Sequence, residues 1–170
     1  MSEFAHPGSG LTKSLWSTSD FDDMEWRNVV IHGFCVRPNI SGGFLPCLLF
    51  DIDYIVGWVH PVPPEERFSF WMAPSTLVFE EVWDVEGSLE FKTSSMKLGI
   101  YDIGKSEVEG KSDDPLWHID GDSFDLKFRS AGYRQYFRQE PHFSPRMVLS
   151  YEERGGISFA EAEFAPGGNL

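Results

Sequence analysis

A regular alternation of apolar and polar positions marks residues 46–58 as the clearest element of the chain. A β-strand turns successive side chains to opposite faces, so this alternation predicts one long strand with one face in a hydrophobic core. The intervening positions include Asp51 and Asp53, which the same alternation places on the opposite, exposed face. The positions expected on the buried face are Leu48, Phe50, Ile52, Tyr54, Val56 and Trp58.

Other segments with strand-like patterns lie along the chain, separated by glycine, proline and other turn-forming residues. Two of them flank Pro74, which interrupts the pattern because proline cannot donate a backbone hydrogen bond. Residues 131–138 fit a strand, with a short helix as the alternative, because their aromatic residues match both spacings. The further strands are expected at residues 26–36, 68–72, 75–85, 89–92, 98–103, 117–120, 124–129, 133–138, 146–151 and 157–161.

The distribution of these segments indicates the fold class. No segment keeps a helical apolar period over about twelve residues, so the sequence predicts little helix. About ten short strands joined by turns predict an all-β, antiparallel fold, either a sandwich or a partly closed barrel. We expect a mobile N-terminal tail at residues 1–23, a single β domain at residues 24–164 and a frayed C-terminus at residues 165–170.

Charge limits the classes of partner. Acidic residues outnumber basic ones by 27 to 14, which gives the chain a formal net charge of −13. A chain this acidic repels nucleic-acid phosphates and anionic membrane surfaces, so neither is an expected partner. The charge serves either solubility or attraction to a basic protein.

Two cysteines, Cys35 and Cys47, are expected as free thiols. The absence of a signal-peptide pattern predicts a soluble cytoplasmic protein.

Motifs for catalysis are missing from the sequence. It contains no glycine-rich phosphate-binding loop, no His-Glu-x-x-His, no Cys-x-x-Cys and no Gly-x-Ser-x-Gly. Asp120-Gly121-Asp122 matches a fragment of a calcium-binding loop but lacks the remaining ligand positions, so we expect a turn there. The chain is therefore expected to lack enzymatic activity and a cofactor.

Histidines, in combination with two aspartates, provide a candidate metal site. His60, His118 and His142 adjoin loops, and together with Asp51 and Asp53 they would bind an ion if the fold brought them together. The sequence does not show such convergence. We therefore predict no metal site.

Two different sites follow from the remaining residues. An acidic face on two neighbouring strands would bind a basic protein and would consist of Asp51, Asp53, Glu80, Glu81 and Asp84. The alternative is an aromatic pocket for binding or hydrolysing a small molecule, lined by Trp58, Trp71, Trp83 and Trp117 with His60. A cavity with a few convergent polar groups would favour the pocket, and a flat carboxylate-rich face would favour protein binding.

Three stretches of the chain resemble segments of a family of small uncharacterised bacterial all-β proteins. They are residues 26–34, residues 49–55 together with Trp58, and residues 70–79. Arg27 and Asn28 stand where that family has histidine and aspartate. The resemblance implies no known activity and supplies no functional residues. A further similarity, to proteins that neutralise toxins, implies an immunity-like function in which the chain binds another protein.

Overall fold

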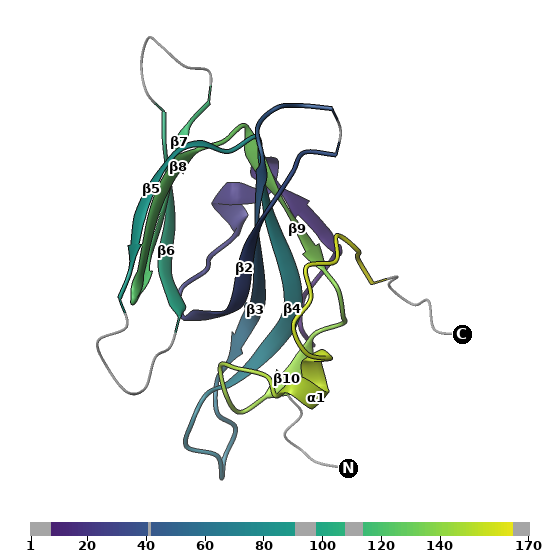
Figure 1. Cartoon of the computed structure of the whole chain (residues 1–170). Helices are drawn as coiled ribbons and strands as arrows, with labels where there is room; N and C mark the ends of the chain where they lie inside the picture. Colours follow the sequence, from purple (N-terminus) through teal and green to yellow (C-terminus); the bar gives the residue numbers. More distant parts are fainter. Residues whose placement is uncertain (1–7, 41, 91–97, 108–113, 165–170) are drawn as a thin grey trace.

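The structure, a computed structural model, describes residues 8–40, 42–90, 98–107 and 114–164 (Figure 1). Within these ranges no helix is both long enough and apolar enough to cross a membrane. The strands are β1 Leu15–Ser17, β2 Val29–Arg37, β3 Cys47–Val59, β4 Ser69–Glu80, β5 Trp83–Leu89, β6 Gly99–Ser106, β7 Leu116–Asp122, β8 Phe124–Arg129, β9 Gly132–Phe137 and β10 His142–Ser144. The two short helices are η1 Thr18–Asp23, a 3-10 helix, and α1 Tyr151–Arg154.

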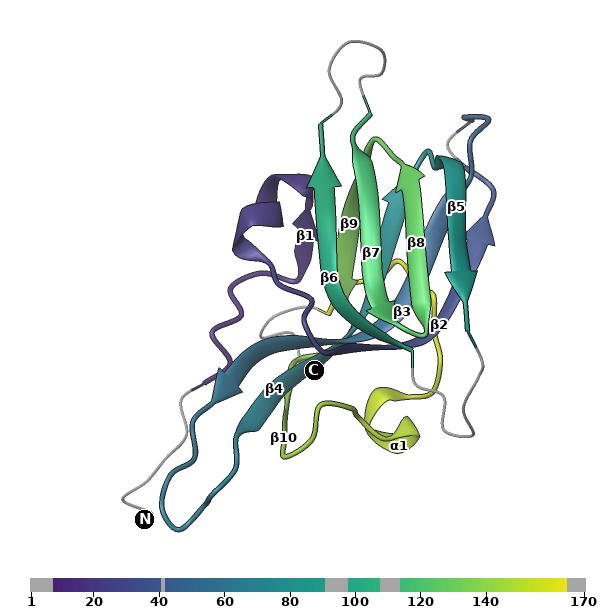
Figure 2. The ribbon, with the colours of Figure 1, turned by 90° about the vertical axis from the view of Figure 1, so that its left-hand side faces the viewer.

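All the strand pairs are antiparallel, and nine strands follow one continuous path in the order β1-β9-β4-β3-β2-β6-β7-β8-β5, with β10 paired to β4. The link between β2 and β6 consists of only two residue pairs, at Val29 and Val30. Beyond these pairs the two strands diverge, so that β6, β7, β8 and β5 form a second layer in front of β9, β4, β3 and β2 (Figure 2). The predicted all-β antiparallel fold is confirmed, and the sheet is not closed, which agrees with the sandwich of the two predicted alternatives.

Aromatic side chains fill the space between the two layers. Phe79 on β4 packs edge-on against Phe128 on β8, with ring centroids 4.8 Å apart, and against Trp117 on β7 at 5.2 Å. Phe50 on β3 meets Phe124 on β8 at 6.1 Å. The predicted burial of one face of the long strand is confirmed for Phe50, Ile52 and Tyr54. It is wrong for Trp58, which is 46% exposed and lies beyond a register shift between Ile55 and Gly57.

The expected N-terminal tail is partly wrong. Residues 1–7 lie outside the described residues, but Leu15–Ser17 pairs with β9 and η1 follows directly. Trp16 packs against Phe137, and Phe21 packs against Trp117. Trp16 and Phe21 are partly buried against the core. Their packing holds in place a segment whose local sequence is typical of a mobile tail. The expected frayed C-terminus, residues 165–170, also lies outside the described residues.

Pro74 does not divide β4 into two strands. Its carbonyl oxygen accepts a hydrogen bond from the N–H of Arg138. The N and C=O of a strand residue point to the same side, so the missing N–H of Pro74 also faces away from β3. On that side β9 pairs with β4 only from Ser75 onward, and β10 pairs only as far as Met72. Pro74 therefore lies between the stretches of β4 that pair with β9 and with β10, and it removes no hydrogen bond from the β3–β4 ladder.

The strands predicted at residues 146–151 and 157–161 are wrong. This part of the chain is irregular apart from α1. Ser150 and Glu153 form a reciprocal capping box at the start of α1, and Gly155, with φ of 78°, ends it. These start and stop signals override a weak apolar alternation. Residues 132–137, in contrast, form the predicted strand, β9.

Candidate functional site

Asp51 and Asp53 are fully buried, so the prediction that they form an exposed binding face is wrong. They do lie on the face of β3 opposite the aromatic core, but the C-terminal segment covers that face. The backbone N–H of Ser158 donates to Asp51 at 3.0 Å, and that of Leu149 donates to Asp53 at 2.9 Å. An alternating pattern cannot distinguish a solvated face from one covered by a polar segment.

The two carboxylates belong to a buried ion cluster, which we define as Asp51, Asp53, Arg138, Arg154 and His32. Arg154 bridges both carboxylates, with its Nε 3.1 Å from Asp53 and its terminal nitrogens 2.7 and 2.8 Å from Asp51. Arg138 donates to Asp51 at 2.7 Å, and His32 Nε2 lies 2.7 Å from Asp53. Two guanidinium groups thus balance two carboxylates, and every carboxylate oxygen has a partner. The cluster attaches the C-terminal segment to β3 and leaves no carboxylate oxygen free for a substrate.

The environment of the cluster shifts the pKa of both carboxyl groups. Burial by itself would raise each pKa. Hydrogen bonds outweigh it, led by that from Arg154 to Asp51 and that between His32 and Asp53, so both pKa values lie below the ordinary value. The folded chain therefore binds protons at these two groups less readily than the unfolded chain.

The free energy of unfolding is expected to fall as the pH drops below about 4. Because the folded pKa of Asp51 and Asp53 is lowered, their contribution is complete above the unfolded pKa and is lost as the pH falls through the folded pKa. Urea unfolding followed by tryptophan fluorescence, from about pH 6 to about pH 3, measures this. Stability that stays constant or rises below about pH 4 would contradict the prediction.

The other predicted acidic residues lie at the end of β4 and beyond it. Glu80 is half-buried and forms an ion pair with Arg134 at 3.2 Å. Glu81 and Asp84 are exposed, with φ of 51° and 53°, where the chain turns from β4 into β5. The five predicted residues therefore do not make one acidic face, although β3 and β4 do pair. Attraction of a basic protein by the net charge stays a prediction.

The predicted tryptophan pocket is not formed. Trp117 is fully buried in the core. Each of the others packs elsewhere: Trp58 against Phe70, Trp71 against Phe143, and Trp83 against the guanidinium of Arg129. His60 packs against Phe68. The four tryptophans lie on four different strands and contact different neighbours. Spacing along the chain does not specify which strands are adjacent, so it could not show whether these side chains meet.

The structure instead contains an apolar groove at the open side of the sandwich. It lies between β2 and β3 of one layer and β5 and β8 of the other and has a volume of about 440 Å³. Figure 2 shows two of these strands, β2 and β5, at its right-hand side. Apolar residues from all four strands line it, among them Phe34, Val36, Leu48, Val85, Leu89 and Phe124.

Solvent reaches several of these apolar side chains. Val36 is 66% exposed, Val85 is 55% exposed, and Phe34 is 39% exposed. Phe34 also packs against Phe124 across the groove, with ring centroids 5.7 Å apart. At Gly87, a Cβ atom would lie 2.3 Å from the backbone oxygen of Asp125, so β5 approaches β8 this closely only because glycine is present.

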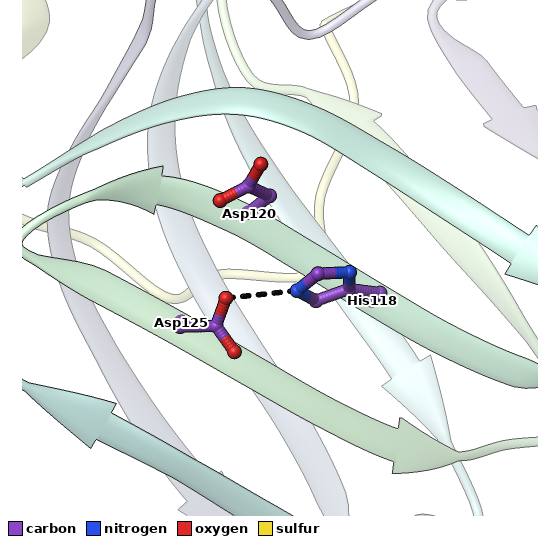
Figure 3. Close-up of side chains that lie close together, drawn as sticks. All are labelled: His118, Asp120 and Asp125. Atoms are coloured by element: carbon purple, nitrogen blue, oxygen red, sulfur yellow. Dashed lines mark hydrogen bonds and ion pairs between the residues drawn. The ribbon is translucent and has the colours of Figure 1, made fainter.

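A polar cluster lies on the outer face of the second layer, on neighbouring strands β7 and β8. Figure 3 shows His118 and Asp125 turned toward each other, with His118 Nε2 2.8 Å from Asp125 Oδ2, and Asp120 close to both. His118 was one of three histidines considered for a metal site, but the structure does not bring the others to it. His142 bonds to Gln139, and His60 packs against Phe68.

No protein-family model, curated protein or solved structure matches this chain. The resemblance to small bacterial proteins and to immunity proteins therefore stays a prediction. Among the described residues, the apolar groove and the cluster of His118, Asp120 and Asp125 are the features that bear on function.

Proposed function

We propose that this chain is a binding protein that holds a small apolar molecule in the groove between β2 and β5. The observation that carries the proposal is the gathering of exposed apolar side chains around one groove, in a chain with a net charge of −13. Proteins rarely expose contiguous apolar surface without a function for it. The volume of about 440 Å³ also falls in the range of known small-molecule sites, roughly 300–1,000 Å³.

Binding is favoured over catalysis by the residues of the groove. Cys47 and Ser88 line it, but among the described lining residues there is no histidine, lysine or arginine to activate a nucleophile. The buried ion cluster lies on the other face of β3 and has no free carboxylate oxygen. The groove therefore supplies contact area rather than reactive groups.

The charge at the groove restricts the chemistry of the ligand. Glu86 and Asp125 belong to its lining, but their side chains share the outer face with Lys127, opposite Glu86, and with His118, which bonds to Asp125. The described lining contains no basic side chain, so an anionic ligand would be repelled by the net charge of −13 and would find no cation in the groove to pair with. The preferred ligand is therefore a neutral apolar molecule, or one that carries a positive charge.

Replacing Val36 with glutamate should weaken binding of the neutral probe N-phenyl-1-naphthylamine by about tenfold or more, which corresponds to about 1.4 kcal/mol. The new carboxylate would have to lose water when the apolar probe enters the groove. Fluorescence titration of the full chain measures the dissociation constant. A sulfonated naphthalene probe should bind the unaltered chain more weakly than the neutral one.

Ile40→Glu provides the matched control. Ile40 is 81% exposed and does not line the groove, so the same change of charge should leave probe binding unaltered. Because Val36 and Ile40 are both largely exposed, neither variant should lose the fold, which thermal unfolding checks. Equal probe affinity for Val36→Glu, Ile40→Glu and the unaltered chain would show that the groove is not the binding site.

A further inference from the structure

We infer that His118, Asp120 and Asp125 form a binding site for a divalent transition-metal ion on the outer face of the β7–β8 hairpin. His118 and Asp120 alternate on β7 and share one face, and Asp125 lies directly opposite Asp120 on β8. One ligand atom from each residue lies within 4.8 Å of the other two (Figure 3). The inference does not rest on the function proposed for the groove, and it replaces the sequence-based prediction that the chain has no metal site.

These separations are close to those that a metal ion requires. A tetrahedral ion bound at about 2.1 Å by each ligand holds two ligand atoms about 3.4 Å apart. His118 Nε2 and Asp125 Oδ2 are already 2.8 Å apart, so these two atoms would open slightly around an ion. Rotation of the Asp120 side chain, which is exposed, would complete a three-ligand set.

The backbone that carries the ligands is held firmly. Ile119, between two of the ligands, and Phe124, beside the third, point inward and are buried in the core. The last pair of the β7–β8 ladder is Asp120 with Asp125, and Ser123, whose φ is 62°, lies in the turn that joins them. Strand positions supported by a packed core hold ligands more precisely than loop positions do.

Charge around the cluster gives a second reason for a cation. Asp102 on β6 lies opposite Asp120, which in turn lies opposite Asp125, so three carboxylates occupy one row across three strands. Like charges directly opposite each other destabilise a sheet. Lys127 faces His118 at the next position of the ladder, and one lysine does not balance three carboxylates. A divalent ion at the cluster would relieve this repulsion.

The donor atoms indicate which ions fit. Calcium and magnesium favour sites made of oxygen ligands, whereas imidazole nitrogen suits zinc and other transition metals. One imidazole and two carboxylates therefore favour Zn²⁺ or Mn²⁺ over Ca²⁺. The side chains of His118 and Asp125 are 37% and 44% exposed, so water has access to complete the coordination.

Isothermal titration of the metal-stripped full chain with ZnCl₂ tests the inference. We expect one zinc ion bound per chain with higher affinity than calcium. Loss of groups that only support a metal ligand weakens metal binding roughly 10–100-fold, so His118→Gln and Asp120→Asn, which remove direct ligands, should weaken zinc binding at least tenfold. Neither change should lower the melting temperature of the metal-free chain by more than a few degrees, because both side chains lie on the outer face.

His60→Gln and Asp84→Asn are the matched controls, since both residues lie outside the cluster. Both control variants should bind zinc as the unaltered chain does. The site is wrong if His118→Gln and His60→Gln bind zinc equally well, because zinc would then be bound by other surface groups. It is also wrong if the unaltered chain binds no zinc, or binds calcium as tightly as zinc.

Discussion

Replacing Arg154 with methionine is expected to lower the free energy of unfolding by about 3–5 kcal/mol. The Arg154 side chain is fully buried and forms ion pairs with both Asp51 and Asp53. Methionine has a similar length but no charge, so two buried carboxylates would share the remaining Arg138 and the neighbouring His32. Removing one member of a buried ion pair leaves an uncompensated charge in a medium of low dielectric constant. Urea unfolding of both chains measures the difference.

Arg27→Met is the control for this substitution. Arg27 forms an ion pair with Glu25 at 3.4 Å, but both side chains are about 70% exposed. Exposed ion pairs stabilise proteins by about 0–1 kcal/mol, so this variant should be nearly as stable as the unaltered chain. If Arg154→Met lost no more stability than Arg27→Met, the buried ion cluster would not be what holds the C-terminal segment to β3.

Local pattern was sufficient to locate most of the strands. The long alternation predicted a strand at residues 46–58, and β3 is Cys47–Val59. The turn signal at Gly121-Asp122 corresponds to the hairpin between β7 and β8. Alternation and turn chemistry act between residues that are close in sequence, so one sequence is enough to read them.

The cover over Asp51 and Asp53 was not predictable in this way. The alternation correctly assigned them to the face opposite Phe50, but their partners Arg138 and Arg154 lie 87 and 103 residues further along the chain from Asp51. Nothing local to β3 indicates which segment returns to it. Basic residues are few in this acidic chain, and Arg138 and Arg154 are two of its 14 lysines and arginines. If the two carboxylates had been expected to be buried, their ion-pair partners would have had to come from these 14 residues.

The groove and the metal-ligand cluster differ in how much of each was visible in the sequence. The groove is formed where β2 leaves β6 after two residue pairs, and its lining comes from four strands, so the order of the strands had to be known first. The cluster is more local. His118 and Asp120 are two residues apart, and a hairpin turn over residues 121–124 brings Asp125 opposite Asp120. A histidine and aspartates at matching positions of a predicted hairpin would have been a usable signal.

Replacing Phe50 with alanine is expected to lower the free energy of unfolding by about 3–5 kcal/mol. Phe50 is fully buried, and its ring meets Phe79 at 6.3 Å on the neighbouring strand and Phe124 at 6.1 Å in the opposite layer. Alanine would remove both ring contacts and leave a cavity between the layers, which the paired strands around it cannot close by a local shift. Urea unfolding at neutral pH provides the measurement.

Phe44→Ala makes the same chemical change at a fully exposed position before β3. It should alter the free energy of unfolding by no more than about 0.5 kcal/mol, because no packed contact is lost. The difference between the two variants therefore reports the burial of Phe50 rather than the general effect of deleting a phenyl ring. If the two variants were equally stable, Phe50 would not lie between two packed layers, and the open sandwich that forms the groove would have to be abandoned.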